Sequence, residues 1–155
     1  MLVDTPPELR LQLIAAGVSA VDAVWFTHIH ADHVHGIDDL RVFTARRGDV
    51  DAYIASEYRE KIARYFEYIF DEAVQAAPGS SIPSVKLHEL EEGRPVGIVG
   101  ESFTPLLVPH GPTNVYGFRV GKLGYITDGK RLPPTTLEAL KGVDVLVLNA
   151  LWFGR

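Results

Sequence analysis

Cysteine is absent from the 155-residue sequence. This absence excludes disulfide bonds, zinc fingers, iron–sulfur clusters and thiol catalysis within the chain. The sequence also lacks an apolar run of the ~20 residues that a membrane-spanning helix needs, and its start has no basic region or long apolar stretch typical of a signal peptide. We therefore expect a cytoplasmic protein without a membrane partner.

Positive charge is scarce, because 15 Lys and Arg residues face 20 Asp and Glu residues, giving a formal net charge of −5. The total shows no basic footprint for nucleic acid, so a nucleic-acid partner is not favoured, although it stays open. Two bound divalent cations would cancel most of this charge, so the acidic total does not exclude an anionic substrate. Hydrophobic residues make up 46% of the chain, which is enough for the core of a single domain over residues 1–155.

Short apolar runs alternate with helix signals along the chain, which indicates an α/β fold. The expected strands cover 1–4, 22–27, 51–55, 85–90, 95–99, 102–108, 114–120, 123–127 and 143–148, with 22–27 and 143–148 buried. Helices are expected before Gly17, over 37–47, over 56–70 and before Gly142. Their start signals are the capping boxes Thr5-x-x-Glu8 and Thr135-x-x-Glu138 and a capping Ser56.

Three imidazoles and a carboxylate lie within six residues, directly after the expected strand 22–27: His28, His30, Asp32 and His33. Imidazole and carboxylate suit zinc, iron or manganese. On a strand, His28 and His30 point to the same side, so both can face one metal. After the turn that follows, Asp32 and His33 can face a second metal.

Two further candidates lie at the ends of other expected strands. His110 stands between Pro109, expected to stop the strand, and Gly111. Asp128 stands before Gly129, and its carboxylate can bridge two cations. Each residue alone is more typical of an ordinary loop or turn, but burying the 28–33 cluster without a cation is costly, and the cluster therefore favours both as ligands.

The remaining polar candidates carry weaker signals. His35 is a weak candidate for contacting substrate and is otherwise a solvated or capping histidine. His88 lies in a polar strand and is expected at the surface. Asp38 and Asp39 are expected to cap the following helix, with the orientation of ligand imidazoles as the alternative. Arg41 and Arg119 could pair with a phosphate, although each is more often solvated or ion-paired.

The segment Thr27–His33 resembles the H-x-H-x-D-H signature of the metallo-β-lactamase superfamily. His110 before Gly111 resembles the third histidine motif of that family, and Thr127-Asp128 resembles its bridging aspartate motif. The opening segment 3–10 and the segment 33–41 look like the phosphodiesterase branch, which includes ribonuclease Z and the cyclic-phosphate phosphodiesterase of phosphonate breakdown. The resemblance implies an αββα sandwich that is incomplete at both termini.

The resemblance also implies a dinuclear site. His28, His30 and His110 would hold one metal, Asp32 and His33 a second, and Asp128 would bridge them. Two divalent ions are expected, zinc first, with manganese or iron open. Asp32 would be the catalytic residue that orients a metal-bound hydroxide toward a small cyclic or nucleotide-like phosphodiester.

Several alternatives stay open at this point. The family's last metal histidine, beyond the bridging aspartate, has no counterpart after Asp128. The chain could be another hydrolase of the same fold, acting on a thioester, a lactam or an RNA 3′ end, or a non-catalytic metal-binding fragment. A homodimer is a further expectation, since missing terminal strands would expose sheet edges.

Overall fold

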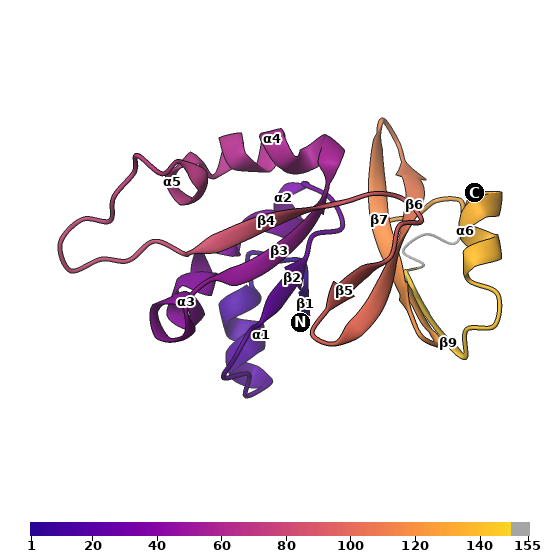
Figure 1. The fold of residues 1–155 in the computed structure, drawn as a ribbon, viewed down its shortest axis with the longest axis horizontal. Helices are drawn as coiled ribbons and strands as arrows, with labels where there is room; N and C mark the ends of the chain where they lie inside the picture. Colours follow the sequence, from indigo (N-terminus) through magenta and orange to yellow (C-terminus); the bar gives the residue numbers. More distant parts are fainter. Residues whose placement is uncertain (150–155) are drawn as a thin grey trace. The chain divides into compact units, whose positions relative to one another are not determined.

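The computed structural model describes residues 1–149, and the chain divides into two units, Met1–Glu89 and Leu90–Arg155. One sheet has four strands in the order β1-β2-β3-β4, and the other has five in the order β5-β6-β7-β8-β9 (Figure 1). Helices accompany both sheets, which confirms the mixed α/β class expected from the sequence. The expectation of a single domain over 1–155 stays a prediction.

The first sheet places polar segments at one edge. Its strands are β1 (Leu2–Val3), β2 (Ala23–Trp25), β3 (Val50–Ala55) and β4 (Val85–Leu90). Because β1, β2 and β3 run parallel, their carboxyl ends lie at the same edge, and the chain leaves β1 and β2 there into Asp4 and into the histidine cluster. Trp25, Phe26 and Ile54 are fully buried and anchor this edge.

The helices of the first unit are α1 (Leu9–Ala15), α2 (Ala31–Val34), α3 (Arg41–Arg47), α4 (Ser56–Tyr65) and α5 (Glu67–Phe70), with a 3₁₀ helix η1 (Ile37–Leu40). The expected helix 37–47 is therefore split into η1 and α3, and α2 begins inside the histidine cluster. The expected helix 56–70 breaks at Phe66, whose backbone has φ −124° and ψ 48°.

The second unit is built on antiparallel pairs. Its elements are β5 (Val96–Ile98), β6 (Glu101–His110), β7 (Thr113–Val120), β8 (Leu123–Ile126), α6 (Pro134–Ala139) and β9 (Val145–Leu148). Strands β5 to β8 pair antiparallel in sequence, and β9 pairs parallel to β8. Leu106, Val108, Ile126 and Leu140 form its core cluster. None of the helices described in residues 1–149 is long and apolar enough to cross a membrane.

The three expected side-chain caps are wrong. Helices α1, α4 and α6 begin without a side-chain cap hydrogen bond. Thr5 is fully buried and its hydroxyl donates to the Val34 carbonyl at 3.1 Å. The Thr135 hydroxyl lies 3.4 Å from Glu92. The two threonine hydroxyls therefore form hydrogen bonds with residues far away in the sequence instead of capping their own helices.

Two strand expectations in the second unit are also wrong. Strand β9 is not buried, because its four residues are 42–55% exposed. Strand β6 does not end before His110: Pro109 pairs with Asn114, and His110 with Thr113. Strand β5 pairs only with Glu101–Phe103, so among the described residues β6 has a partner strand on one side at Pro109, where a missing N–H is tolerated.

Gly36 provides a test of the packing that holds the histidine segment. Its N–H donates to the Thr5 carbonyl at 2.8 Å, and a Cβ there would lie 2.1 Å from the Pro6 carbonyl oxygen. We expect Gly36→Ala to lower the free energy of unfolding in urea by about 2 kcal/mol, because backbone must move to admit the methyl group. Gly97→Ala is the control, since a Cβ there meets nothing within 4 Å. Equal stability of the two variants would contradict this packing.

Candidate metal centre

The histidine cluster of the first unit begins where β2 ends. Phe26 N–H still donates to the Tyr53 carbonyl at 2.8 Å, so the chain stays extended beyond β2. His28 is 1% exposed, and His30 has an extended backbone (φ −67°, ψ 151°) directly before α2. The extended segment explains why alternate residues present their rings to the same side.

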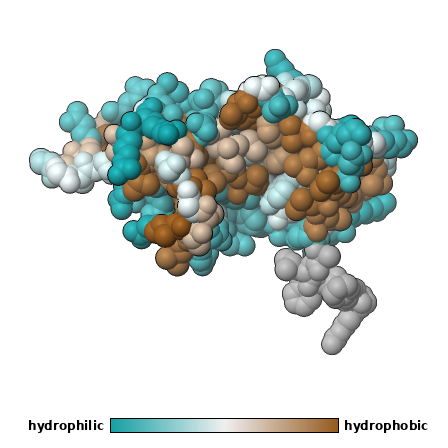
Figure 2. Space-filling model, turned by 90° about the horizontal axis from the view of Figure 1, so that it is seen from below, coloured by the Kyte–Doolittle hydropathy of each residue, from teal (hydrophilic) through white to brown (hydrophobic). Residues whose placement is uncertain are grey.

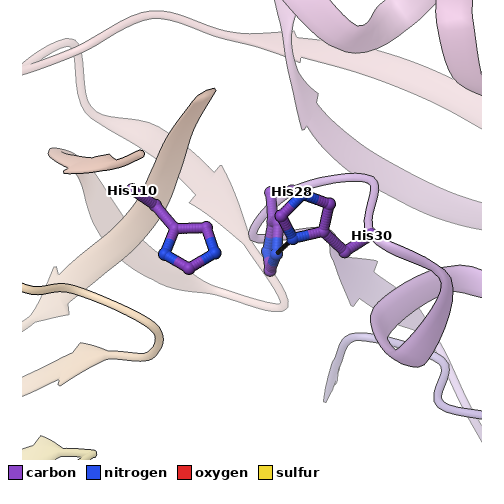
Figure 3. Close-up of side chains that lie close together, drawn as sticks. All are labelled: His28, His30 and His110. Carbon is purple, nitrogen blue, oxygen red and sulfur yellow. Dashed lines mark hydrogen bonds between the residues drawn. The ribbon is translucent and has the colours of Figure 1, made fainter. Parts of the chain in front are cut away.

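The rings of His28 and His30 lie against each other. His28 Nε2 lies 2.8 Å from His30 Nδ1, and the ring centroids are 4.5 Å apart at an interplanar angle of 80° (Figure 3). The His33 ring also lies against His28, with centroids 4.2 Å apart. Two imidazoles, those of His30 and His33, therefore lie against the buried ring of His28.

The Asp4 carboxylate, which the sequence reasoning missed, organises two of these rings. Asp4 is 6% exposed, and it accepts the Thr27 N–H and the Thr27 hydroxyl, each at 2.8 Å. It also lies 2.7 Å from His33 Nδ1. Burial raises the pKa of the Asp4 carboxyl above its usual range, and the hydrogen bonds from His33 and Thr27 oppose that rise.

These contacts set the tautomers of His28 and His33. The single proton of the Thr27 hydroxyl goes to Asp4, so the 3.0 Å contact between Thr27 Oγ1 and His28 Nδ1 requires the imidazole to donate. His33 Nδ1 likewise donates to Asp4. Each neutral ring then carries its lone pair on Nε2. A metal-binding histidine usually donates its other ring N–H to a carboxylate, a backbone carbonyl or water. His33 has such a carboxylate in Asp4, and the Thr27 hydroxyl accepts from His28 in the same way, so these residues fit a cation.

Asp32 lies in the first turn of α2 with an exposed side chain. Its carboxylate Oδ2 is 3.6 Å from His33 Nε2, so the two potential ligand atoms lie next to each other. The side chain is 80% exposed, which leaves the carboxylate accessible to solvent.

The weaker candidates of the first unit make contacts other than those expected from the sequence. His35 is exposed, and its ring lies edge-on to Phe66 at 6.2 Å. Asp38 does not cap η1; it accepts from the Tyr68 hydroxyl at 3.1 Å and pairs with Arg41 at 2.9 Å. Burial, followed by the charge of Asp38, raises the pKa of Tyr68 to about 12.

Three further candidates, Asp39, His88 and Arg119, make contacts within the protein. Asp39 does not cap η1 either, and it lies 3.7 Å from Arg10. His88 is exposed as expected, and its Nε2 lies 2.7 Å from an Asp51 carboxylate oxygen. The Arg119 guanidinium donates to three backbone carbonyls at 2.6–3.0 Å, those of Gly121, Ala139 and Lys141. These hydrogen bonds stabilise the second unit.

The second unit contributes two candidates at strand ends. His110 is the last residue of β6, and the Thr113 hydroxyl donates to its carbonyl at 3.0 Å, which fixes the turn that follows (Figure 3 labels His110). Asp128 follows β8 with φ 54°, and its carboxylate accepts from the Thr127 hydroxyl at 3.0 Å. His110 and Asp128, like His28, His30 and His33, each offer a ligand atom for a cation.

Asp4→Asn tests the role of the carboxylate. Asparagine tolerates the positive φ of 60° at this position, but it offers one acceptor oxygen in place of two. We expect the affinity for zinc, measured by competition with a chromophoric chelator, to fall roughly 10- to 100-fold. The Nδ1–H tautomer of His33, read from nitrogen chemical shifts, should lose its dominance.

Asp22→Asn is the matched control, because Asp22 is exposed. Its zinc affinity should stay within about twofold of the original. An Asp4→Asn protein that binds zinc as tightly as the control would show that the carboxylate does not support the ligands.

Comparison with known proteins places these residues in a family context. The family model described as "Beta-lactamase superfamily domain" matches residues 1–154. Among curated proteins, the chain is 31% identical over 155 residues to an octanoyltransferase from Porphyromonas gingivalis (strain ATCC BAA-308 / W83). That match covers all of this chain and only 30% of the octanoyltransferase.

Two solved structures show the same fold. A diphosphatase from the PhnP family is 31% identical, with a TM-score of 0.79 over 94% of this chain and 54% of that one. Zn(2+)-bound PqqB from Methylobacterium extorquens is 19% identical, with a TM-score of 0.74 over 96% of this chain and 55% of that one. The chain thus spans about half the length of both structures, and the metallo-β-lactamase fold expected from the sequence is confirmed.

Proposed function

The chain belongs to the β-lactamase superfamily, and from this premise we propose that it is a metal-dependent hydrolase of small phosphodiesters. The observation that carries the proposal is the chain of hydrogen bonds from the Asp4 carboxylate to Thr27, His28 and His33. A network that fixes the Nε2 lone pairs of two neighbouring imidazoles is expected for metal ligands and has little use in a plain hydrophobic core.

We assign the ligands as the sequence resemblance implies. His28, His30 and His110 would hold one ion, Asp32 and His33 would hold another, and Asp128 would be a ligand of both. Imidazole and carboxylate favour zinc, with manganese and iron as alternatives. When bound, two divalent ions supply Lewis acidity to phosphate oxygens and lower the pKa of water.

The chain's own residues then have distinct tasks. Asp4 and Thr27 hold the imidazole rings in the binding tautomer. Asp32, whose carboxylate is exposed, orients the attacking water and accepts its proton. His35 is exposed one residue beyond α2, where it can contact substrate.

The substrate class rests on two kinds of support. The opening segment and the segment after the histidine cluster resemble the phosphodiesterase branch, and the PhnP-family diphosphatase is 31% identical to the chain. The octanoyltransferase, equally similar, favours an acyl-group substrate as the second candidate. Its match covers 30% of that protein, so the name describes a molecule of which this chain resembles a minor part.

An activity screen separates these candidates. The zinc- or manganese-loaded chain should hydrolyse bis-p-nitrophenyl phosphate in preference to nitrocefin and p-nitrophenyl octanoate. His30→Ala should lower kcat/KM at least about 100-fold, because a metal ligand is lost. His88→Ala is the control, since this exposed histidine binds Asp51 outside the cluster.

The other outcomes decide among the alternatives. Faster cleavage of nitrocefin or of the octanoate ester would replace the phosphodiester with an acyl substrate. Bound metal without turnover of any of the three substrates would make the chain a non-catalytic metal-binding module. A small-molecule phosphodiester is the only partner that we propose; the cytoplasmic location and a homodimer stay predictions.

A further inference from the structure

A groove runs between α1 and the consecutive helices η1 and α3 of the first unit, with a volume of about 300 Å³. Helix α1 lies at the lower edge of Figure 1 and faces the viewer of Figure 2, where hydrophobic patches interrupt the hydrophilic surface. The groove contains none of the proposed metal ligands.

Helical spacing gives the groove an apolar interior. Leu13 and Ile14 lie one turn after Arg10 on α1, and Val42 and Phe43 lie one turn before Arg46 and Arg47 on α3. Leu13 and Phe43 are each 7% exposed and form the floor. Ile14 is 71% exposed and Val42 53% exposed, so the walls offer uncovered hydrocarbon.

The polar lining of the groove is cationic. Arg10, Arg46 and Arg47 line it against a single carboxylate, Asp39, which gives a local charge of 3 − 1 = +2. Asp39 lies 3.7 Å from Arg10, and in the described part of the chain no ion pair involves Arg46 or Arg47. This local excess stands against a net charge of −5 for the chain, so the groove selects for a negative group.

The size of the groove favours a small ligand. A volume of about 300 Å³ lies at the lower end of small-molecule sites. A folded protein partner would need about 800 Å² of surface on each side, and the two seven-residue helices are each only about 10 Å long. These dimensions suit a short aliphatic chain lying along the helices.

We propose that this groove binds a medium-chain aliphatic molecule with an anionic head group. The hydrocarbon lies on Leu13 and Phe43 between Ile14 and Val42. The head group, a carboxylate or a phosphate, pairs with the guanidinium groups of Arg46 and Arg47, whose planar fork matches either anion.

Calorimetric titration of the purified chain tests the proposal. Decanoate and decyl phosphate, both below their micellar concentrations, are expected to bind with a Kd on the order of 100 µM. Decyltrimethylammonium, with the same hydrocarbon and the opposite charge, should bind at least about tenfold more weakly. The ratio of the two anions identifies which head group the arginines favour.

Two pairs of variants locate the site. Reversal of both charges, Arg46→Glu with Arg47→Glu, should weaken decanoate about tenfold, whereas Arg64→Glu on α4 should not. Ile14→Ser should weaken it about fivefold, whereas Leu11→Ser, equally exposed on α1 at 68% but outside the groove, should not.

Three results would overturn the proposal. The first is the absence of anion binding tighter than about 1 mM. The second is equal binding of the cationic amphiphile or equal effects of groove and control variants. The third is a concentration-dependent shift of α1 and α3 amide resonances without ligand, which would assign the groove to a second copy of the chain.

Discussion

The buried Asp4 carboxylate is the interaction on which the site of the first unit depends. It stands directly after β1, yet its partners lie 23 and 29 residues away in the chain. A carboxylate that is 6% exposed is costly unless it is hydrogen-bonded, and here three donors converge on it. The neighbouring backbone repeats the connection, because Thr5 N–H donates to the His33 carbonyl and Gly36 N–H to the Thr5 carbonyl. The end of β1 and the histidine segment are therefore held together by both side-chain and backbone hydrogen bonds.

The parallel arrangement of β1, β2 and β3 explains why this contact exists. Strands that run parallel deliver their following segments to the same edge of the sheet, so Asp4 and Thr27 meet there without any sequence proximity. Thr27 then relays the constraint to His28, and Asp4 acts on His33 directly. Hydrogen bonds to Asp4 and Thr27 thus hold two of the proposed ligand rings, while the Asp32 side chain is exposed.

The sequence predicted the parts of this arrangement that have a local pattern. The alternation of His28 and His30 after a buried strand was sufficient to place two rings on one side, and Gly after Asp128 marked a turn. Asp4 was missed because a single aspartate after a two-residue strand has no periodicity, and its burial follows only from the register of β1 against β2. The position was nevertheless part of the segment 3–10 that resembled the phosphodiesterase branch. The capping boxes failed for the same reason, since the Thr5 hydroxyl is bound by Val34 across the fold.

The central claim is that the proposed ligands form a dinuclear metal site: His28, His30, Asp32, His33, His110 and Asp128. Elemental analysis of the purified chain, after dialysis against zinc or manganese and removal of excess ion, tests it most directly. We expect about two equivalents of metal per chain, because Asp32, His33 and Asp128 would give the second cation the three protein ligands that are usual in catalytic zinc sites. One equivalent would contradict the dinuclear assignment, and no bound metal in supplemented protein would contradict the metal-dependent function altogether.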